Sequence, residues 1–203
     1  DASEKNIHQI KNSSFFWKHD LEAKSCFINK SNINNILLES KLDKNNIGIL
    51  SIDIDGNDYW VWKEISVIDP LIVIIEFNSV FGFYEKISVP YKENFFRTKA
   101  HHSNLFWGAS IEAFKFLAAQ KGYEFLSTNS AGNNAYFIKK NLYKKINFKL
   151  KKNIYQSKFR ESRDIKGNKT FTRYNERLRI INDMVVENVE TNKLSKLVDL
   201  DLK

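Results

Sequence analysis

Three carboxylates stand close together in the chain, at the end of an apolar segment. The run 47–54 is apolar enough to form a buried strand. Asp53 lies near its end, Asp55 directly follows it, and Asp58 comes three residues later. Side chains two residues apart on a strand share one face, so Asp53 and Asp55 would lie about 6–7 Å apart. Like charges that close are costly unless they share a cation or a proton. The pair could therefore bind a divalent metal, or Asp53 could act as a general base. Alternatively, Asp55 or Asp58 only caps the helix that begins at Tyr59.

Two further groups could act beside these carboxylates. Glu76 and Asn78 close the next apolar run, where an acid and an amide could bind a substrate or complete a metal shell; alternatively, they only cap backbone groups. His101 and His102 are adjacent, which disfavours joint binding of one metal. A histidine near its ordinary pKa suits deprotonation of a hydroxyl, so we expect His102 as a candidate base and His101 beside the substrate. The alternative is that both are inert surface residues.

The elements that must position these groups alternate between strands and helices. We expect strands at 25–29, 47–54, 71–77, 123–128 and 135–139. We expect helices at 31–40, 59–65, 110–120 and 173–186, and a peripheral tail to residue 203. This order predicts a mostly parallel α/β sheet, with a C-terminal hairpin that adds an antiparallel strand. Ligands of such sheets bind at the carboxyl ends of the strands, which is where the candidate residues fall. The stretch 78–104 has no clear period and is expected to be a functional or mobile loop.

Composition excludes several classes of protein. The 203 residues are 42 % hydrophobic and 14 % aromatic, enough for a packed core and too many for a disordered chain. A single cysteine, Cys26, excludes an internal disulfide framework and fits a reducing compartment. The sequence has no targeting segment at its start and no apolar run near the ~20 residues that span a bilayer. We therefore expect a cytoplasmic protein without a transmembrane segment. Because residue 1 is Asp and not Met, we also expect a processed or truncated sequence.

Positive charge is concentrated in one stretch. The chain carries +8, but residues 139–179 hold fifteen Lys or Arg and three acids, a net +12 that leaves −4 for the rest. Such a stretch could dock on phosphate, on anionic lipid or on an acidic substrate. It lacks the interleaved aromatics and groove-reading motifs of a nucleic-acid reader, so we do not expect nucleic acid as a partner. The alternative is a solvated face in a chain that is rich in Lys, Asn and Ile throughout.

Several segments resemble a known family. LSIDIDGNDYWVW at 50–62 and VIIEFNS at 73–79 resemble the FkbM-like branch of S-adenosylmethionine-dependent methyltransferases. SNLFWGAS at 103–110 and NSAGNNAYFI at 129–138 resemble proteins of this type that are often attributed to surface-polysaccharide loci, and FRESRD at 159–164 resembles their tail. The resemblance extends from residue 1 to about 179. It implies a Rossmann-like methyltransferase fold whose final hairpin supplies the antiparallel strand.

The resemblance also implies roles for individual residues. The family's first strand and glycine-rich turn are missing here, so we expect that this chain alone binds the cofactor poorly and is inactive. The implied positions are Asp1 on the cofactor ribose, Phe27, Ile28 and Asn29 beside the adenine, Asp53 facing the methyl group and the acceptor, and Asn78 facing the acceptor.

The sequence thus predicts a partial Rossmann-like methyltransferase domain over 1–146 and a basic C-terminal extension over 147–203. The expected reaction is methyl transfer from S-adenosylmethionine to an oxygen or nitrogen of a small molecule or sugar. Asp53, Asp55 and His102 are the candidate catalytic residues; Asp53 and Asp55 are also candidate metal ligands; Glu76, Asn78 and His101 are the candidate substrate contacts. Two alternatives are a non-catalytic binding protein with this fold and a nucleic-acid methyltransferase that uses the basic stretch.

Overall fold

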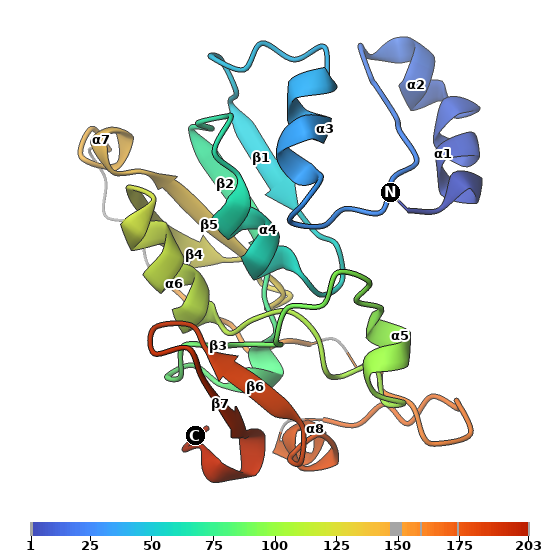
Figure 1. The fold of residues 1–203 in the computed structure, drawn as a ribbon, viewed down its shortest axis with the longest axis vertical. Helices are drawn as coiled ribbons and strands as arrows, with labels where there is room; N and C mark the ends of the chain where they lie inside the picture. The colour runs from blue at the N-terminus through green and yellow to red at the C-terminus, as the bar shows by residue number, and fades with distance from the viewer. Residues whose placement is uncertain (1, 147–151, 159, 174, 203) are drawn as a thin grey trace.

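The computed structural model describes residues 2–146, 152–158, 160–173 and 175–202 (Figure 1). Within them the chain forms an α/β structure with one four-stranded and one three-stranded sheet. The larger sheet contains, in spatial order, β1 (Ile49–Ile52), β2 (Ile72–Glu76), β5 (Asn134–Lys139) and β4 (Tyr123–Thr128). The smaller sheet contains β3 (Ile87–Ser88), β6 (Val185–Asn188) and β7 (Lys193–Lys196). The helices are α1 (Glu4–Lys11), α2 (Ser14–Lys18), α3 (Ile33–Glu39), α4 (Asp58–Glu64), α5 (Arg97–Ala100), α6 (Ile111–Gln120), α7 (Lys140–Tyr143) and α8 (Asn175–Ile180), with 3₁₀ turns η1 (Ser79–Phe81) and η2 (Leu197–Asp199).

The larger sheet is mixed, so the prediction of a mostly parallel sheet is wrong. β1 and β2 pair in parallel, but the β2–β5 and β5–β4 pairings are antiparallel. The β4–β5 turn explains this arrangement, because the Asn129 side chain accepts hydrogen bonds from the backbone of Gly132, Asn133 and Asn134 and so reverses the chain tightly. The returning strand β5 then lies between β2 and β4. β1, β2 and β4 consequently run in one direction and β5 in the other.

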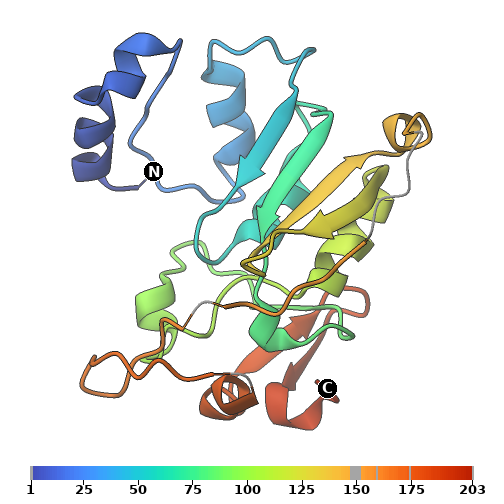
Figure 2. The same cartoon turned by 180° about the vertical axis from the view of Figure 1, so that it is seen from behind.

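One face of this sheet carries the main core. Figure 1 shows α4 and α6 in front of the strands, and Figure 2 shows the strands from the opposite face. The register places Val73 beside Phe137 and Ile75 beside Ala135, and all four side chains are buried. The other face is less covered, since Ile74 is only half-buried. The strand predicted at 71–77 is confirmed in β2, but its two faces are buried unequally.

The amphipathic helix predicted at 110–120 is confirmed as α6. Ser110 caps it, accepting a hydrogen bond from Ala113 N at 3.2 Å, and Phe114 and Leu117 are buried against the sheet. The helix ends before Gly122, whose φ of 80° suits a residue without a side chain. The helix predicted at 59–65 is likewise confirmed as α4, and its Trp60 and Trp62 pack in the core.

The strand predicted at 25–29 is wrong. Among the described residues this segment pairs with no strand, and β1 remains an edge of the sheet. Its end is held instead by a local turn, in which Asn29 N donates to Asn32 Oδ1 at 2.9 Å and Asn32 N donates to Asn29 Oδ1 at 3.1 Å. A single apolar run predicts extended backbone, but a strand forms only where a neighbouring strand accepts and donates its backbone hydrogen bonds.

The C-terminal part forms a second core, contrary to the expected long helix and peripheral tail. The helix predicted at 173–186 ends at Ile180, because Val185 and Val186 join β6, where β-branched residues are favoured. β6 pairs with β3, which lies in the stretch 78–104 that was expected to be a loop. Leu197 of the tail is buried in this second core.

None of the helices in the described part of the chain is both long enough and apolar enough to cross a lipid bilayer.

Candidate functional site

The turn from β1 into α4 is organised by Asp58. Its carboxylate is buried and accepts hydrogen bonds from Ile54 N at 3.0 Å and from Gly56 N at 2.9 Å. Burial raises the pKa of Asp58 to about 6, and the two backbone hydrogen bonds oppose that shift. Asp55, between these donors, adopts a φ of 56°. Asp58 therefore has the capping role that was the alternative to a catalytic one. It stabilises the turn at which Asp53 and Asp55 lie.

Glu76 ends β2, and Asp53 directly follows the neighbouring strand β1. Glu76 is 8 % exposed, and burial, followed by the charges of Asp53, Asp58 and Asp55, raises its pKa to about 9. Its Oε2 has no hydrogen-bond partner in the described part of the chain. The pKa of Asp53 is raised by partial burial and by Asp55, and a hydrogen bond with Glu76 opposes this shift. Near neutral pH Glu76 thus keeps its proton.

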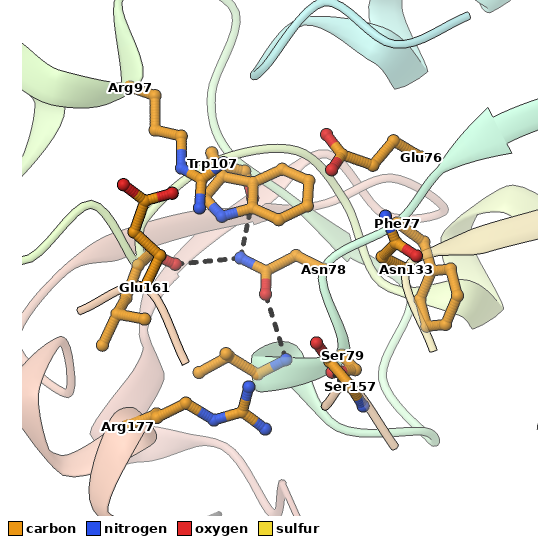
Figure 3. Close-up of a pocket in the computed structure, with 12 residues that line it drawn as sticks. Glu76, Phe77, Asn78, Ser79, Arg97, Trp107, Asn133, Ser157, Glu161 and Arg177 are labelled. Carbon is orange, nitrogen blue, oxygen red and sulfur yellow. Dashed lines mark hydrogen bonds between the residues drawn. The ribbon is translucent and has the colours of Figure 1, made fainter. Parts of the chain in front are cut away.

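Arg97 supplies a positive charge that the sequence analysis did not identify. One of its terminal nitrogens, Nη1, donates to Asp55 Oδ1 at 2.9 Å, and its Nε donates to the carbonyl of Asn104 at 2.8 Å. The guanidinium also lies 4.7 Å from the centre of the Trp107 ring, and Figure 3 shows the two side by side. The cluster of acids in the sequence predicts that a positively charged side chain lies nearby. Nothing in the local sequence of 78–104 identifies Arg97 as that side chain.

A cleft of about 380 Å³ opens beside this cluster, at the carboxyl end of β1. That volume lies in the usual range for small-molecule sites. Phe27, Ile28, Asp53 and Asp55, four of the predicted site residues, lie on its walls. The remaining walls come from Ala2, Cys26, Ser51, Ile54, Asn57 and Phe95. The structure therefore joins the segment around Phe27 and the end of β1 in one site, although they do not pair as strands.

Asn29, another predicted cofactor residue, is not on the wall of this cleft. The side-chain oxygen of Asn29 accepts hydrogen bonds from Ser31 Oγ and Asn32 N, so it stabilises the turn before α3. Asp1 lies outside the described residues; its neighbour Ala2 is on the cleft wall.

Asn78 is committed to holding the loops together. Its amide nitrogen donates to the carbonyls of Leu105 and Trp107, both at 2.9 Å, and its oxygen accepts from Val80 N at 3.0 Å (Figure 3). With Glu76 it borders a second cavity of only about 40 Å³, which is room for a few water molecules and not for a sugar. Asn78 therefore caps backbone groups, which was the alternative to a role in substrate binding.

The two histidines do not join the acidic cluster. Their rings lie 4.2 Å apart, and Nδ1 of His101 is 2.8 Å from Ser103 Oγ. Burial, followed by the neighbouring His102, lowers the pKa of His101. Neither ring lines the cleft or the small cavity. The structure gives His102 no contact with Asp53 through which it could act as the base.

Metal binding at Asp53 and Asp55 stays a prediction. Across the described ranges no group of three or more His, Cys, Asp and Glu side chains is arranged to hold a metal ion. Asp55 is hydrogen-bonded to Arg97, and a metal would compete with that guanidinium for its carboxylate.

No family model, curated protein or solved structure matches the chain.

Proposed function

We propose that this chain forms the adenosine and methyl end of an S-adenosylmethionine-dependent methyltransferase with a Rossmann-like fold. The acceptor would be an oxygen or nitrogen of a small molecule or sugar. The observation that carries the proposal is the convergence of Phe27, Ile28 and Asp53 on one cleft at the carboxyl end of β1. The parallel β1–α4–β2 unit and the reversed strand of the final hairpin also support it.

The walls of the cleft suit the chemistry of this cofactor. Phe27 and Ile28 offer an apolar surface for an adenine ring, and the Phe27 ring is fixed by Phe96, with ring centres 5.0 Å apart. Asp53 adds negative charge opposite them, which complements a positively charged sulfonium. The cofactor would supply a methyl group activated by that sulfonium. The sequence has no glycine-rich turn for the methionine end, so the proposal concerns the adenosine and methyl end alone.

Asp53 is the group that would remove the acceptor's proton. Its raised pKa makes it a better base than an ordinary aspartate, and the protonated Glu76 beside it adds no second negative charge. Arg97 holds Asp55 through a hydrogen bond, which leaves Asp53 to meet the acceptor. The protein's remaining contribution would be to position the two partners for in-line displacement.

The substitution Asp53→Asn tests this proposal in the protein as the cell makes it. We expect methyl transfer to fall by at least about 100-fold, because the general base is lost. Binding of S-adenosylhomocysteine, measured by isothermal titration, should persist, because Phe27 and Ile28 are unchanged. Glu93→Gln, at an exposed carboxylate beside α3, is the control and should leave both measurements unchanged.

Two results would contradict the proposal. Unchanged turnover in Asp53→Asn would remove Asp53 from the mechanism. Absence of heat with both S-adenosylmethionine and S-adenosylhomocysteine in the wild type would favour a non-catalytic binding protein.

A further inference from the structure

A short hairpin between residues 161 and 172 projects from the body of the molecule. Thr170 N donates to the carbonyl of Ser162 at 2.8 Å, and Asp164 N donates to the carbonyl of Asn168 at 2.9 Å. In Figures 1 and 2 this orange segment extends away from the sheets, next to α5. The hairpin can therefore contact a partner that is too large to enter a cleft.

Its conformation is set by side chains of its own. The Asp164 carboxylate accepts hydrogen bonds from Lys166 N at 2.9 Å and Asn168 N at 2.8 Å. The buried Ser162 hydroxyl is 2.6 Å from that of Thr170. A partner would meet a structure that is already formed, so binding would not have to order a flexible loop.

The tip of the hairpin exposes an aliphatic side chain. Gly167 N donates to the carbonyl of Asp164 at 2.9 Å, which places Ile165 and Lys166 at the corners of the turn. Ile165 is 84 % exposed, more than any other large hydrophobic side chain in the described part of the chain. Turn corners usually carry polar residues, Gly or Pro. Phe171, on the returning strand, is 55 % exposed and has a φ of 51°. The fold itself gives neither side chain a core contact.

Positive charge surrounds this apolar tip. The exposed basic residues from 158 to 173 are Lys158, Arg160, Lys166, Lys169 and Arg173. With Arg163 the span holds six Lys or Arg against two acids, Glu161 and Asp164, which is a net charge of +4. The outward charge of the hairpin is thus strongly positive.

We propose that this hairpin docks the protein on an anionic lipid bilayer. Ile165 would enter the headgroup region, and Lys166 and Lys169 would contact acidic headgroups. Cations alone would suit nucleic acid as well, but an exposed aliphatic tip gains nothing from a phosphate backbone. An apolar tip with a basic surround is the combination that favours a membrane interface. This docking does not depend on the proposed methyl transfer.

Sedimentation with lipid vesicles tests the proposal. We expect the wild-type protein to sediment with phosphatidylcholine vesicles that contain phosphatidylserine, and not with pure phosphatidylcholine. Raising the salt concentration should release it. Ile165→Ser should lower the partition coefficient about tenfold, and Lys166→Ala/Lys169→Ala should lower it roughly 30-fold.

Matched controls separate the hairpin from exposure or charge in general. Leu194→Ser removes an aliphatic side chain that is 62 % exposed on β7, and Lys144→Ala/Lys145→Ala removes two exposed lysines after α7. Both controls should bind vesicles like the wild type. The proposal is overturned if the wild type does not prefer the anionic vesicles, or if Ile165→Ser binds as well as Leu194→Ser. A third result would also overturn it: duplex DNA releases the protein from the vesicles and binds the wild type and Ile165→Ser equally. That result would identify nucleic acid as the partner.

Discussion

At the scale of single residues, the acidic cluster depends on where the protons lie. The sequence places Asp53 and Glu76 at the ends of two apolar runs, and the rule that ligands bind at the carboxyl ends of such strands predicts that both lie at one edge of the sheet. It does not reveal that Glu76 is buried with one oxygen unpaired, because the cavity that Glu76 borders is also lined by Trp107 and other residues from later in the chain. Arg97 was missed for the same reason. Asn78 was predicted as an acceptor contact, yet its amide is fully used by backbone groups.

The protonation of Glu76 predicts how stability depends on pH. Its pKa is raised to about 9 in the folded protein from an ordinary value of 4.5. Between these values the folded state binds more protons than the unfolded state, so the free energy of unfolding falls as pH rises. From pH 5 to pH 8 this group accounts for a loss of at most about 4 kcal/mol. Glu76→Gln imitates the protonated carboxyl and should remove most of that decline.

Urea unfolding at a series of pH values measures this effect. Glu93→Gln, at an exposed carboxylate, is the control and should keep the wild-type slope. If Glu76→Gln instead changes the free energy of unfolding by the same amount at pH 5 and at pH 8, then Glu76 is ionised in the folded protein.

At the scale of elements, local patterns predict which segments are regular but not which of them pair. The apolar run of β2, the amphipathic face of α6 and the turn residues after Thr128 are local, and all three predictions are confirmed. The segment around Phe27 also has a short apolar run, at 26–28, but it lies across a cleft from β1 and forms no strand. Whether a segment finds a strand to pair with depends on the arrangement of the whole sheet, which a local pattern does not contain.

The β1–α4 turn offers a sharp test of how that cleft is built. A Cβ added to Gly56 would lie 2.2 Å from Cδ1 of Phe95, a residue of the cleft wall. Gly56→Ala should therefore force the Phe95 ring to move and lower the free energy of unfolding by about 1–3 kcal/mol. Gly48→Ala, just before β1, is the matched control, because nothing lies within 4 Å of its added Cβ. That control should be neutral or stabilising by up to about 1 kcal/mol. Equal effects of the two substitutions in urea unfolding would show that the ring does not press against the turn.

At the scale of the whole molecule, two cores are joined by contacts far apart in sequence. β3 has only two residues, and it pairs with β6 almost a hundred residues later. No periodic pattern can reveal a strand that short, which is why 78–104 read as a loop and the tail as peripheral. Trp60 connects the cores, since its indole nitrogen in the first core donates to the carbonyl of Val89 in the second at 2.8 Å.

If the two cores unfold as one unit, a change in the tail must destabilise the distant sheet. Leu197 is 2 % exposed in the second core, and its neighbour Val198 is 57 % exposed. Leu197→Ala should lower the free energy of unfolding by about 3 kcal/mol, whereas Val198→Ala should change it by no more than about 0.5 kcal/mol. Tryptophan fluorescence, which includes Trp60 and Trp62 of the first core, should report the same midpoint shift as far-ultraviolet circular dichroism. Separate midpoints by the two probes would mean that the two cores do not unfold as one unit, which would contradict this prediction.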